Sequence, residues 1–147
     1  MWYLYGFVLM AGIANAVQAG LNGALSKGLA QSLTAGLVVA AGTATCILTV
    51  GLISGHLTWP TADQVSHMPW WAWFGGILGG GIILAQFVVA QKIGAAPFLG
   101  LLVTAGVVTS VVLDHFGLIG FEQHTANGWR LGGGLLMIVG VTLVAVF

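Results

Sequence analysis

Charge is what this sequence has least of. Three Lys plus Arg and three Asp plus Glu make up 4% of its 147 residues, whereas a soluble domain carries about 25% charged residues. Hydrophobic residues account for 59% of the chain, and the mean hydropathy is +1.06. This composition excludes an ordinary water-soluble fold and predicts an integral membrane protein. The net charge of zero leaves no basic patch for nucleic acid, so we expect no such partner.

Cysteine is also nearly absent. The sequence contains one cysteine, Cys46, which lies in an apolar stretch. This excludes a disulfide framework and a thiol pair for metal or redox chemistry. The apolar segments contain no nucleophile beside a base, no paired carboxylates and no His or Cys cluster at metal-ligand spacing. His56 and His67 share a loop in which Asp63 is the only carboxylate. We therefore expect neither an enzyme nor a bound metal or cofactor.

Long apolar runs dominate what is present. A bilayer core is about 30 Å thick and needs about 20 apolar residues per helix, so charged residues and prolines mark the span ends. The N-terminus lacks the charged region and cleavage site of a secretory signal, so we expect the first span to be retained. The sequence predicts an all-α protein with one transmembrane domain over residues 1–147, whose five helical spans cover residues 2–25, 30–55, 69–90, 97–113 and 129–147.

The cations give only a weak orientation signal. An odd number of spans puts the two termini on opposite sides of the membrane. Lys27 and Lys92 follow the first and third spans, on the side of the C-terminus, whereas Arg130 and the terminal amine lie on the other side. The positive-inside rule places the C-terminus in the cytoplasm, but by a difference of one side chain. Insertion in one orientation and insertion in both therefore stay open.

Tryptophan marks the span ends. At these ends, amphipathic rings sit at headgroup depth, so the rings indicate an interfacial belt. A ligand stacked on Trp73 or Phe74 is the alternative interpretation. The tryptophans concerned are Trp59, Trp70, Trp71, Trp73 and Trp129.

Three carboxamides share one face of the first span. At about 100° per residue, Asn15, Gln18 and Asn22 lie in a stripe roughly 80° wide that Ala11 and Ser26 extend. Unpaired amides in hydrocarbon cost several kcal/mol. The stripe therefore predicts either hydrogen bonds between helices or a polar pathway lined by amides, and three amides on one face favour the pathway.

The third span carries a fourth amide among glycines. Gln86 shares a face with Gly75 and Gly79, and Gly76 with Gly80 forms a second row of small residues. Such rows let helices pack closely, and Gly128 with Gly132 repeats the pattern in the fifth span. Gln86 fits equally well as a packing residue or as a further lining residue of the pathway.

Asp114 is the only carboxylate close to a span. It ends a row with Gly106 and Ser110 on the fourth span, where it is a candidate for ion coupling. Arg130 begins the fifth span on the same side of the membrane, so an interfacial Asp114–Arg130 ion pair is the favoured interpretation.

Several motifs follow one another in a fixed order. They are Gln18–Leu25 in the first span, Gly75–Gly79 in the third, Gly94–Ala96 before the fourth, Asp114–Leu118 after it, and Arg130 with Gly132 in the fifth. Taken together, these motifs resemble the YdcZ-type family of bacterial inner-membrane proteins in the drug/metabolite transporter superfamily. The resemblance covers essentially the whole chain. It implies a multi-pass inner-membrane transporter whose five-helix units work as antiparallel pairs. Such a pair can be two copies of one dual-topology chain, two chains of opposite orientation from separate genes, or one fused chain. The weak charge bias of this short chain suits the first arrangement, a dual-topology homodimer.

The sequence departs from related patterns at two places. It is more distantly similar to the small multidrug resistance family, whose dimers use a first-helix glutamate for proton exchange, but here the first span carries only amides. Val107 stands where the YdcZ-type family often has a glutamine. Proton antiport and selectivity for cationic drugs are therefore not expected from the first span.

These patterns lead to one main hypothesis and two alternatives. The main hypothesis is a secondary transporter, an exporter of a small molecule, in which Asn15, Gln18, Asn22 and Gln86 contact the substrate near the bilayer midplane of an antiparallel homodimer. The alternatives are a non-transporting scaffold, in which the amides join helices, and a passive pore for a small neutral solute.

Overall fold

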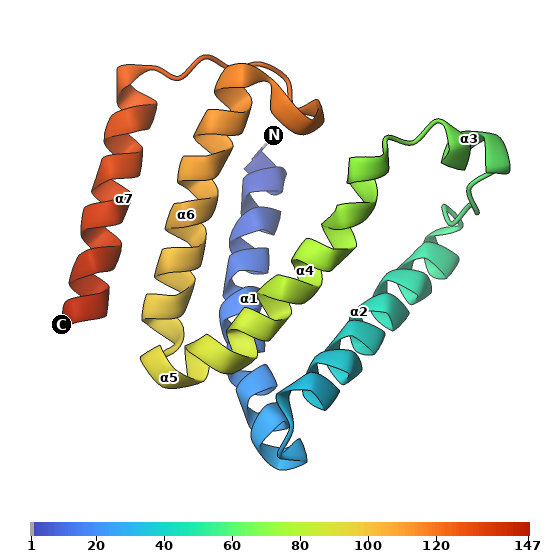
Figure 1. Cartoon of the computed structure of the whole chain (residues 1–147), viewed down its shortest axis with the longest axis horizontal. Helices are drawn as coiled ribbons and strands as arrows, with labels where there is room; N and C mark the ends of the chain where they lie inside the picture. Colours follow the sequence, from blue (N-terminus) through green and yellow to red (C-terminus); the bar gives the residue numbers. More distant parts are fainter. Residues whose placement is uncertain (1) are drawn as a thin grey trace. The chain divides into compact units, whose positions relative to one another are not determined.

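The computed structural model describes residues 2–147, and its regular elements are all helical (Figure 1). Five of its helices are long and apolar enough to cross a membrane, which confirms the predicted all-α class and the number of spans. They are α1 (Trp2–Leu29), α2 (Ser32–Ser54), the run Trp70–Ile93 that contains α4, α6 (Ala95–Phe116) and α7 (Gly128–Val146). Contacts divide the chain into two compact units, residues 1–88 and 89–147.

In the first unit, α1 and α2 form a hairpin. The turn is short, with Ala30 at a positive φ of 51° and Gln31 as the N-cap of α2. The Ser26 and Ser32 hydroxyl oxygens lie 3.0 Å apart across it. Helix α1 continues to Leu29, past the predicted end at residue 25, which puts Lys27 in the last turn, where a cation interacts favourably with the helix dipole.

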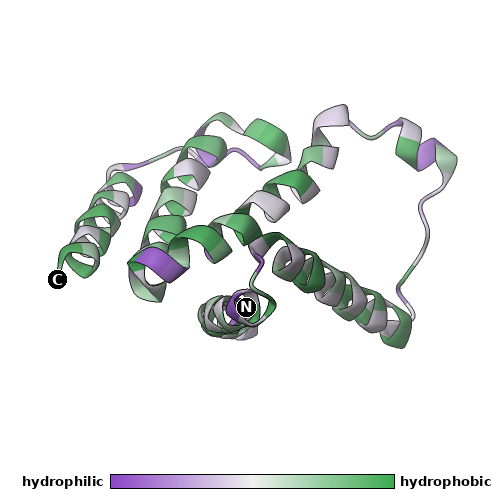
Figure 2. Cartoon of the chain, turned by 60° about the horizontal axis from the view of Figure 1, so that its bottom comes forward, coloured by the Kyte–Doolittle hydropathy of each residue, from purple (hydrophilic) through white to green (hydrophobic). Residues whose placement is uncertain are grey.

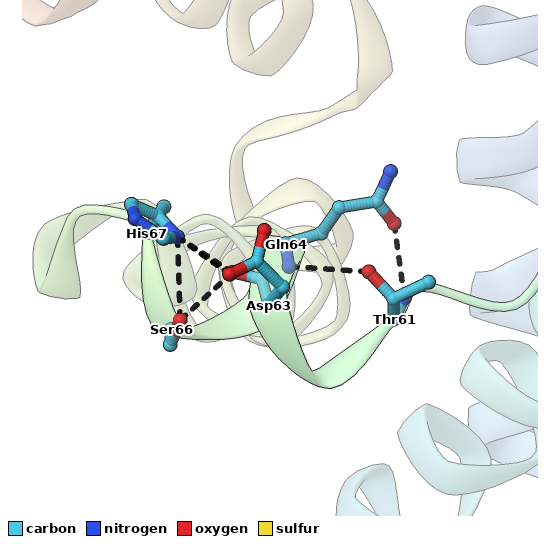
Figure 3. A network of polar contacts seen from close by, with 5 residues as sticks. All are labelled: Thr61, Asp63, Gln64, Ser66 and His67. Carbon is cyan, nitrogen blue, oxygen red and sulfur yellow. Dashed lines mark hydrogen bonds and ion pairs between the residues drawn. The ribbon is translucent and has the colours of Figure 1, made fainter.

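The segment between α2 and the third span contains a short helix that the sequence analysis treated as a polar loop. Helix α3 (Ala62–Ser66) begins with a capping box, in which the Gln64 backbone N–H donates to Thr61 Oγ1 at 3.3 Å (Figure 3). The Thr61 backbone N–H donates in turn to Gln64 Oε1 at 2.9 Å. The Thr-x-x-Gln spacing is a sequence signal for this start, so the helix was predictable.

The third span changes helix type along its length. It starts as a 3-10 turn, η1 (Trp70–Trp73), and continues as α4 (Phe74–Ala85). A π-helical stretch, η2 (Gln86–Ala90), follows, and α5 (Gln91–Ile93) leads to Gly94 at a φ of 93°. Helix α2 packs on α4 where Gly36 leaves room, since a Cβ at Gly36 would lie 3.7 Å from the Phe87 ring.

The second unit is an α6–α7 hairpin with interlocking small and branched residues. A Cβ at Gly100 would lie 2.5 Å from Val141 Cγ2, so only glycine fits this contact without a shift of Val141. Gly134 is buried on α7, and a Cβ there would lie 3.8 Å from Val108 Cγ2. The connection contains η3 (Leu118–Gly120), where Gly117, Ile119 and Gly120 have positive φ.

The long helices present apolar surfaces outward. Figure 2 shows hydrophobic residues along most of each long helix and hydrophilic residues mainly at helix ends and in connections. None of the residues in the most apolar 18-residue segment of α2 is buried. The glycine rows of α4 are also open, because a Cβ at Gly75, Gly76, Gly79 or Gly80 would meet nothing within 4 Å. Lipid or another protein surface must therefore cover these faces.

Candidate functional site

An amide pair joins the first and third spans. The Asn22 Nδ2–H group donates to Gln86 Oε1 at 2.6 Å, across 64 positions of the sequence. Asn22 lies on α1 and Gln86 is the first residue of the π-helical stretch η2, and both lie in the first unit. The side chains are 4% and 5% exposed. Two of the four predicted substrate-contacting residues are thus brought together in an apolar surrounding.

Small neighbours make room for this pair. Ala19 and Gly23 flank Asn22 on the buried side of α1, and Ala35 of α2 is fully buried. Phe87 follows Gln86 and is also buried, against the Gly36 position of α2. Because Ala19 and Gly23 of α1 and Ala35 of α2 have a small side chain or none, the long Gln86 side chain can reach Asn22. An amide left alone here would lose a hydrogen bond in a low-dielectric environment, which costs about 1–3 kcal/mol.

The pair lies away from the middle of both spans, toward the ends that carry Lys27 and Lys92. At 1.5 Å of rise per residue, Asn22 is about 10 Å along the axis from the middle of α1 (Trp2–Leu29), and Gln86 is about 7 Å from the middle of the run Trp70–Ile93. The middle of α1 falls instead at Asn15. A midplane site around the first helices would therefore contain Asn15, with the Asn22–Gln86 pair on one side of it.

The other two amides of the stripe are less enclosed. Asn15 is half-buried and Gln18 is exposed. Within residues 2–147 neither side chain makes a hydrogen bond, whereas Ser26 at the end of the stripe pairs with Ser32. The single chain therefore encloses only the Asn22 end of the predicted stripe, and the exposed amides require water, ligand or another chain as a partner.

A second polar cluster closes one end of the α6–α7 hairpin. Arg130 Nη2 donates to Asp114 Oδ2 at 2.6 Å, and the two side chains are 36% and 21% exposed. Arg130 Nη1 also donates to the His124 carbonyl at 3.2 Å. Helix α6 extends beyond its predicted end at residue 113, so Asp114 lies in its last turn, opposite the first turn of α7. This geometry is that of an ion pair between the end of α6 and the start of α7.

Hydrogen bonds tie the connecting loop to the same cluster. The His124 backbone N–H donates to the Asp114 carbonyl at 2.8 Å, and the Ala126 N–H donates to His115 Nδ1 at 3.1 Å. Gln123 Nε2 donates to the His115 carbonyl at 3.0 Å. Within residues 2–147 no three His, Cys, Asp or Glu side chains converge as metal ligands would. These hydrogen bonds therefore hold the loop between α6 and α7 against the end of the hairpin.

Two features of the structure were not predicted from the sequence. The π-helical stretch η2 begins at Gln86, and such single-turn π segments often occur at functional sites. The residues Gln86–Ala90 show no composition that distinguishes them from α-helix, so no sequence signal was available. The tight glycine of α6, Gly100, was also missed because it does not belong to a GxxxG pair.

Comparisons with known proteins agree with this architecture. The sequence model of a family described as "Putative inner membrane exporter, YdcZ" matches residues 3–143. The curated "Inner membrane protein YdcZ" of Escherichia coli (strain K12) is 31% identical over 83 residues, which are 56% of this chain and 55% of that protein. The matched region thus spans about half the length of this relative. No solved structure matches the chain.

The five apolar helices and these matches define a multi-pass protein of the bacterial inner membrane. The chain belongs to the YdcZ family, which confirms the resemblance carried by its sequence motifs. The description of this family as an exporter supports a membrane transporter.

Proposed function

We propose that the chain is a secondary transporter that exports a small molecule by alternating access as an antiparallel homodimer. The observation that carries this proposal is the Asn22–Gln86 pair, which places hydrogen-bonding groups inside two apolar spans without any charge. The family description as an exporter supports the direction of transport. Amides can exchange hydrogen bonds between ligand, water and one another, which suits a site that must release what it binds.

The four amides have distinct roles in this proposal. Asn15, at the middle of α1, contacts the substrate at the midplane, and Gln18 contacts it one turn further along. Asn22 and Gln86 bind it on the side of Lys27 and Lys92. The Asp114–Arg130 pair, with its 2.6 Å contact, keeps the α6–α7 hairpin closed and does not couple transport to an ion.

Inverted symmetry supplies the mechanism. Two identical chains in opposite orientations have the same structure facing each side of the membrane, so inward-open and outward-open states arise by exchange of conformations between the two copies. The open glycine rows of α4 are suited to close and mobile packing against the second copy, because a Cβ there meets nothing in the single chain. The single five-helix domain of residues 1–147 is the unit that we propose to pair.

The scaffold alternative is favoured by one specific observation. Asn22 and Gln86 hydrogen-bond directly to each other, as expected for amides that only join helices. Such bonds are worth about 0.6–2 kcal/mol in membranes, enough to contribute to assembly without any ligand. The two functions differ in what happens when one amide is removed.

Leucine substitutions separate these functions. We expect Asn22→Leu and Gln18→Leu to abolish export while the chain still assembles, because leucine is suited to an apolar span but has no hydrogen-bonding group. The measurement compares the metabolites released by cells that express each variant, with size-exclusion chromatography of the purified proteins. Gln91→Leu, an exposed glutamine of the third span, serves as the control. Unchanged export in both variants would overturn the site, and dissociation or misfolding would support the scaffold. Release that never saturates would indicate a pore.

A further inference from the structure

The Asn22–Gln86 bond leaves part of each amide unused. A carboxamide offers two N–H donors and an oxygen with two acceptor positions, and the 2.6 Å bond uses one N–H of Asn22 and one acceptor position of Gln86. Within residues 2–147 the Asn22 Oδ1 and Gln86 Nε2 atoms make no hydrogen bond. One acceptor and one donor therefore remain unused on two directly bonded amides that are more than nine-tenths buried.

These two atoms are not fully enclosed by other protein atoms. In the part of the chain that the structure describes, no side-chain nitrogen or oxygen atom is fully buried without a hydrogen-bond partner. Since Oδ1 and Nε2 have no partner, each must have some accessible surface, even though the side chains are 4% and 5% exposed. The pair thus presents a narrow polar edge in an otherwise apolar environment that includes Phe87.

The charge around this edge favours an uncharged ligand. No carboxylate lies within the first or third span, so a cation would be desolvated without compensation. The nearest cations, Lys27 and Lys92, follow the pair by five and six residues, about 7–9 Å along the axes, and both are exposed. At that distance they face the interface, where water screens them.

We propose that the Asn22–Gln86 pair binds a neutral small molecule through a carboxamide-like edge, with an N–H group beside a carbonyl oxygen. The ligand N–H donates to Asn22 Oδ1, and the ligand carbonyl accepts from Gln86 Nε2–H. The class comprises primary and secondary carboxamides, lactams and ureas. This proposal rests on the proposed transport function, because it names the substrate class of the same site.

Three small probes of the same shape test whether the site prefers neutral carboxamide-like ligands. Benzamide has both donor and acceptor and no charge, benzamidinium has donors only and a positive charge, and benzoate has acceptors only and a negative charge. Saturation-transfer NMR measures their binding to the full chain in nanodiscs of phosphatidylethanolamine and phosphatidylglycerol. We expect saturable benzamide binding that is at least about tenfold tighter than that of either ion, since each ion leaves a buried partner unpaired and 1.4 kcal/mol corresponds to a factor of ten. Equal or tighter binding of an ion, or no binding of benzamide, would overturn the proposal.

Substitutions of Gln86 test whether benzamide binds at the Asn22–Gln86 pair. Gln86→Leu should abolish benzamide binding, and Gln91→Leu in the same span should leave it unchanged; retained binding in Gln86→Leu would exclude this site. Gln86→Glu keeps the shape and adds a carboxylate, so we expect it to reverse the preference toward benzamidinium through charge-assisted hydrogen bonds. An unreversed preference in a folded Gln86→Glu protein would also overturn the assignment.

The outcome is distinguishable from a failure of the transport proposal. Loss of export in Asn22→Leu, together with no preference for benzamide, would mean that the chain transports another class of molecule. Selective benzamide binding without any Asn22-dependent export would mean that the ligand class is right and transport is not the function of the site.

Discussion

Among the individual residues, the carboxamides and the ion pair differ in how far the sequence could predict them. The periodicity of α1 predicted a stripe of Asn15, Gln18 and Asn22, because helical geometry alone fixes which residues share a face. It could not predict that Gln86 reaches Asn22, since a lone amide has no periodic partner. That contact depends on small residues of α1 and α2, and their role becomes evident only when the helices are packed together.

The Asp114–Arg130 pair was predicted from topology, as both residues lie at neighbouring span ends on one side of the membrane. We expect Asp114→Asn to lower the free energy of unfolding by about 1–3 kcal/mol, because a charge-assisted hydrogen bond to Arg130 is lost. Thermal unfolding in detergent provides the measurement. Asp63→Asn is the matched control, since the Asp63 side chain is 87% exposed and its contact with His67 is a surface contact (Figure 3).

A double-mutant cycle tests the interpretation of this pair. Arg130→Gln should destabilise the chain in the same way, and adding it to Asp114→Asn should cost less than the sum of the two single changes. If Asp114→Asn abolished export without any change in unfolding, Asp114 would be a coupling residue and the ion pair would be secondary.

At the scale of the helices, the positions of charged residues and prolines predicted which segments cross the membrane. The spacing of glycines was a poorer guide to how these helices pack. The GxxxG pairs Gly75–Gly79 and Gly128–Gly132 suggested close helix packing, yet a Cβ at these positions meets nothing within 4 Å in the described chain. A Cβ would meet a side chain of a facing helix at Gly36, Gly100 and Gly134 instead, most closely at Gly100. A small residue fits a contact only when the facing helix presents a complementary branched side chain, and that complementarity is a property of two elements together.

The α6–α7 contact gives a prediction that isolates packing. We expect Gly100→Ala to destabilise the second unit by about 1–3 kcal/mol through overpacking, because its Cβ would lie 2.5 Å from Val141 Cγ2. Thermal unfolding and protease resistance of residues 89–147 within the full chain measure the effect. Gly106→Ala, in the same helix with open space around it, should be neutral or slightly stabilising.

The added variant Val141→Ala makes this test specific. In the Gly100→Ala background it should restore much of the lost stability, since it removes the Cγ atoms that the new methyl group meets. If stability were not restored, the destabilisation by Gly100→Ala would arise within α6 itself rather than from the α6–α7 contact.

For the whole molecule, composition was sufficient to predict a membrane protein with five spans, because the apolar requirement of a bilayer core is strong and local. The span ends shifted by a few residues, as at Leu29 and Phe116, because helices continue into the interface until a glycine or a positive φ stops them. Pairing and orientation depend on a balance of three basic side chains, which sequence alone could not resolve.

Orientation is therefore the property that single charges should change. We expect a compartment-sensitive reporter at the C-terminus to give signal on both sides of the membrane, because the cations differ by one between sides. Gln31→Lys, beside Lys27, should increase the cytoplasmic signal, and Thr125→Lys, in the loop before Arg130, should decrease it. Exclusively cytoplasmic signal that neither change moves would indicate a parallel assembly or an oppositely oriented partner chain.

The position of the Asn22–Gln86 pair, about 7–10 Å from the middle of its spans, has a consequence for such a dimer. In two antiparallel copies the pair would occur twice, once nearer each surface, with the two Asn15 side chains between them. A molecule that crosses the membrane would then meet the same groups in the same order from either side. A single change in the gene would alter both approaches at once, so selection could not tune uptake and release separately until the gene was duplicated.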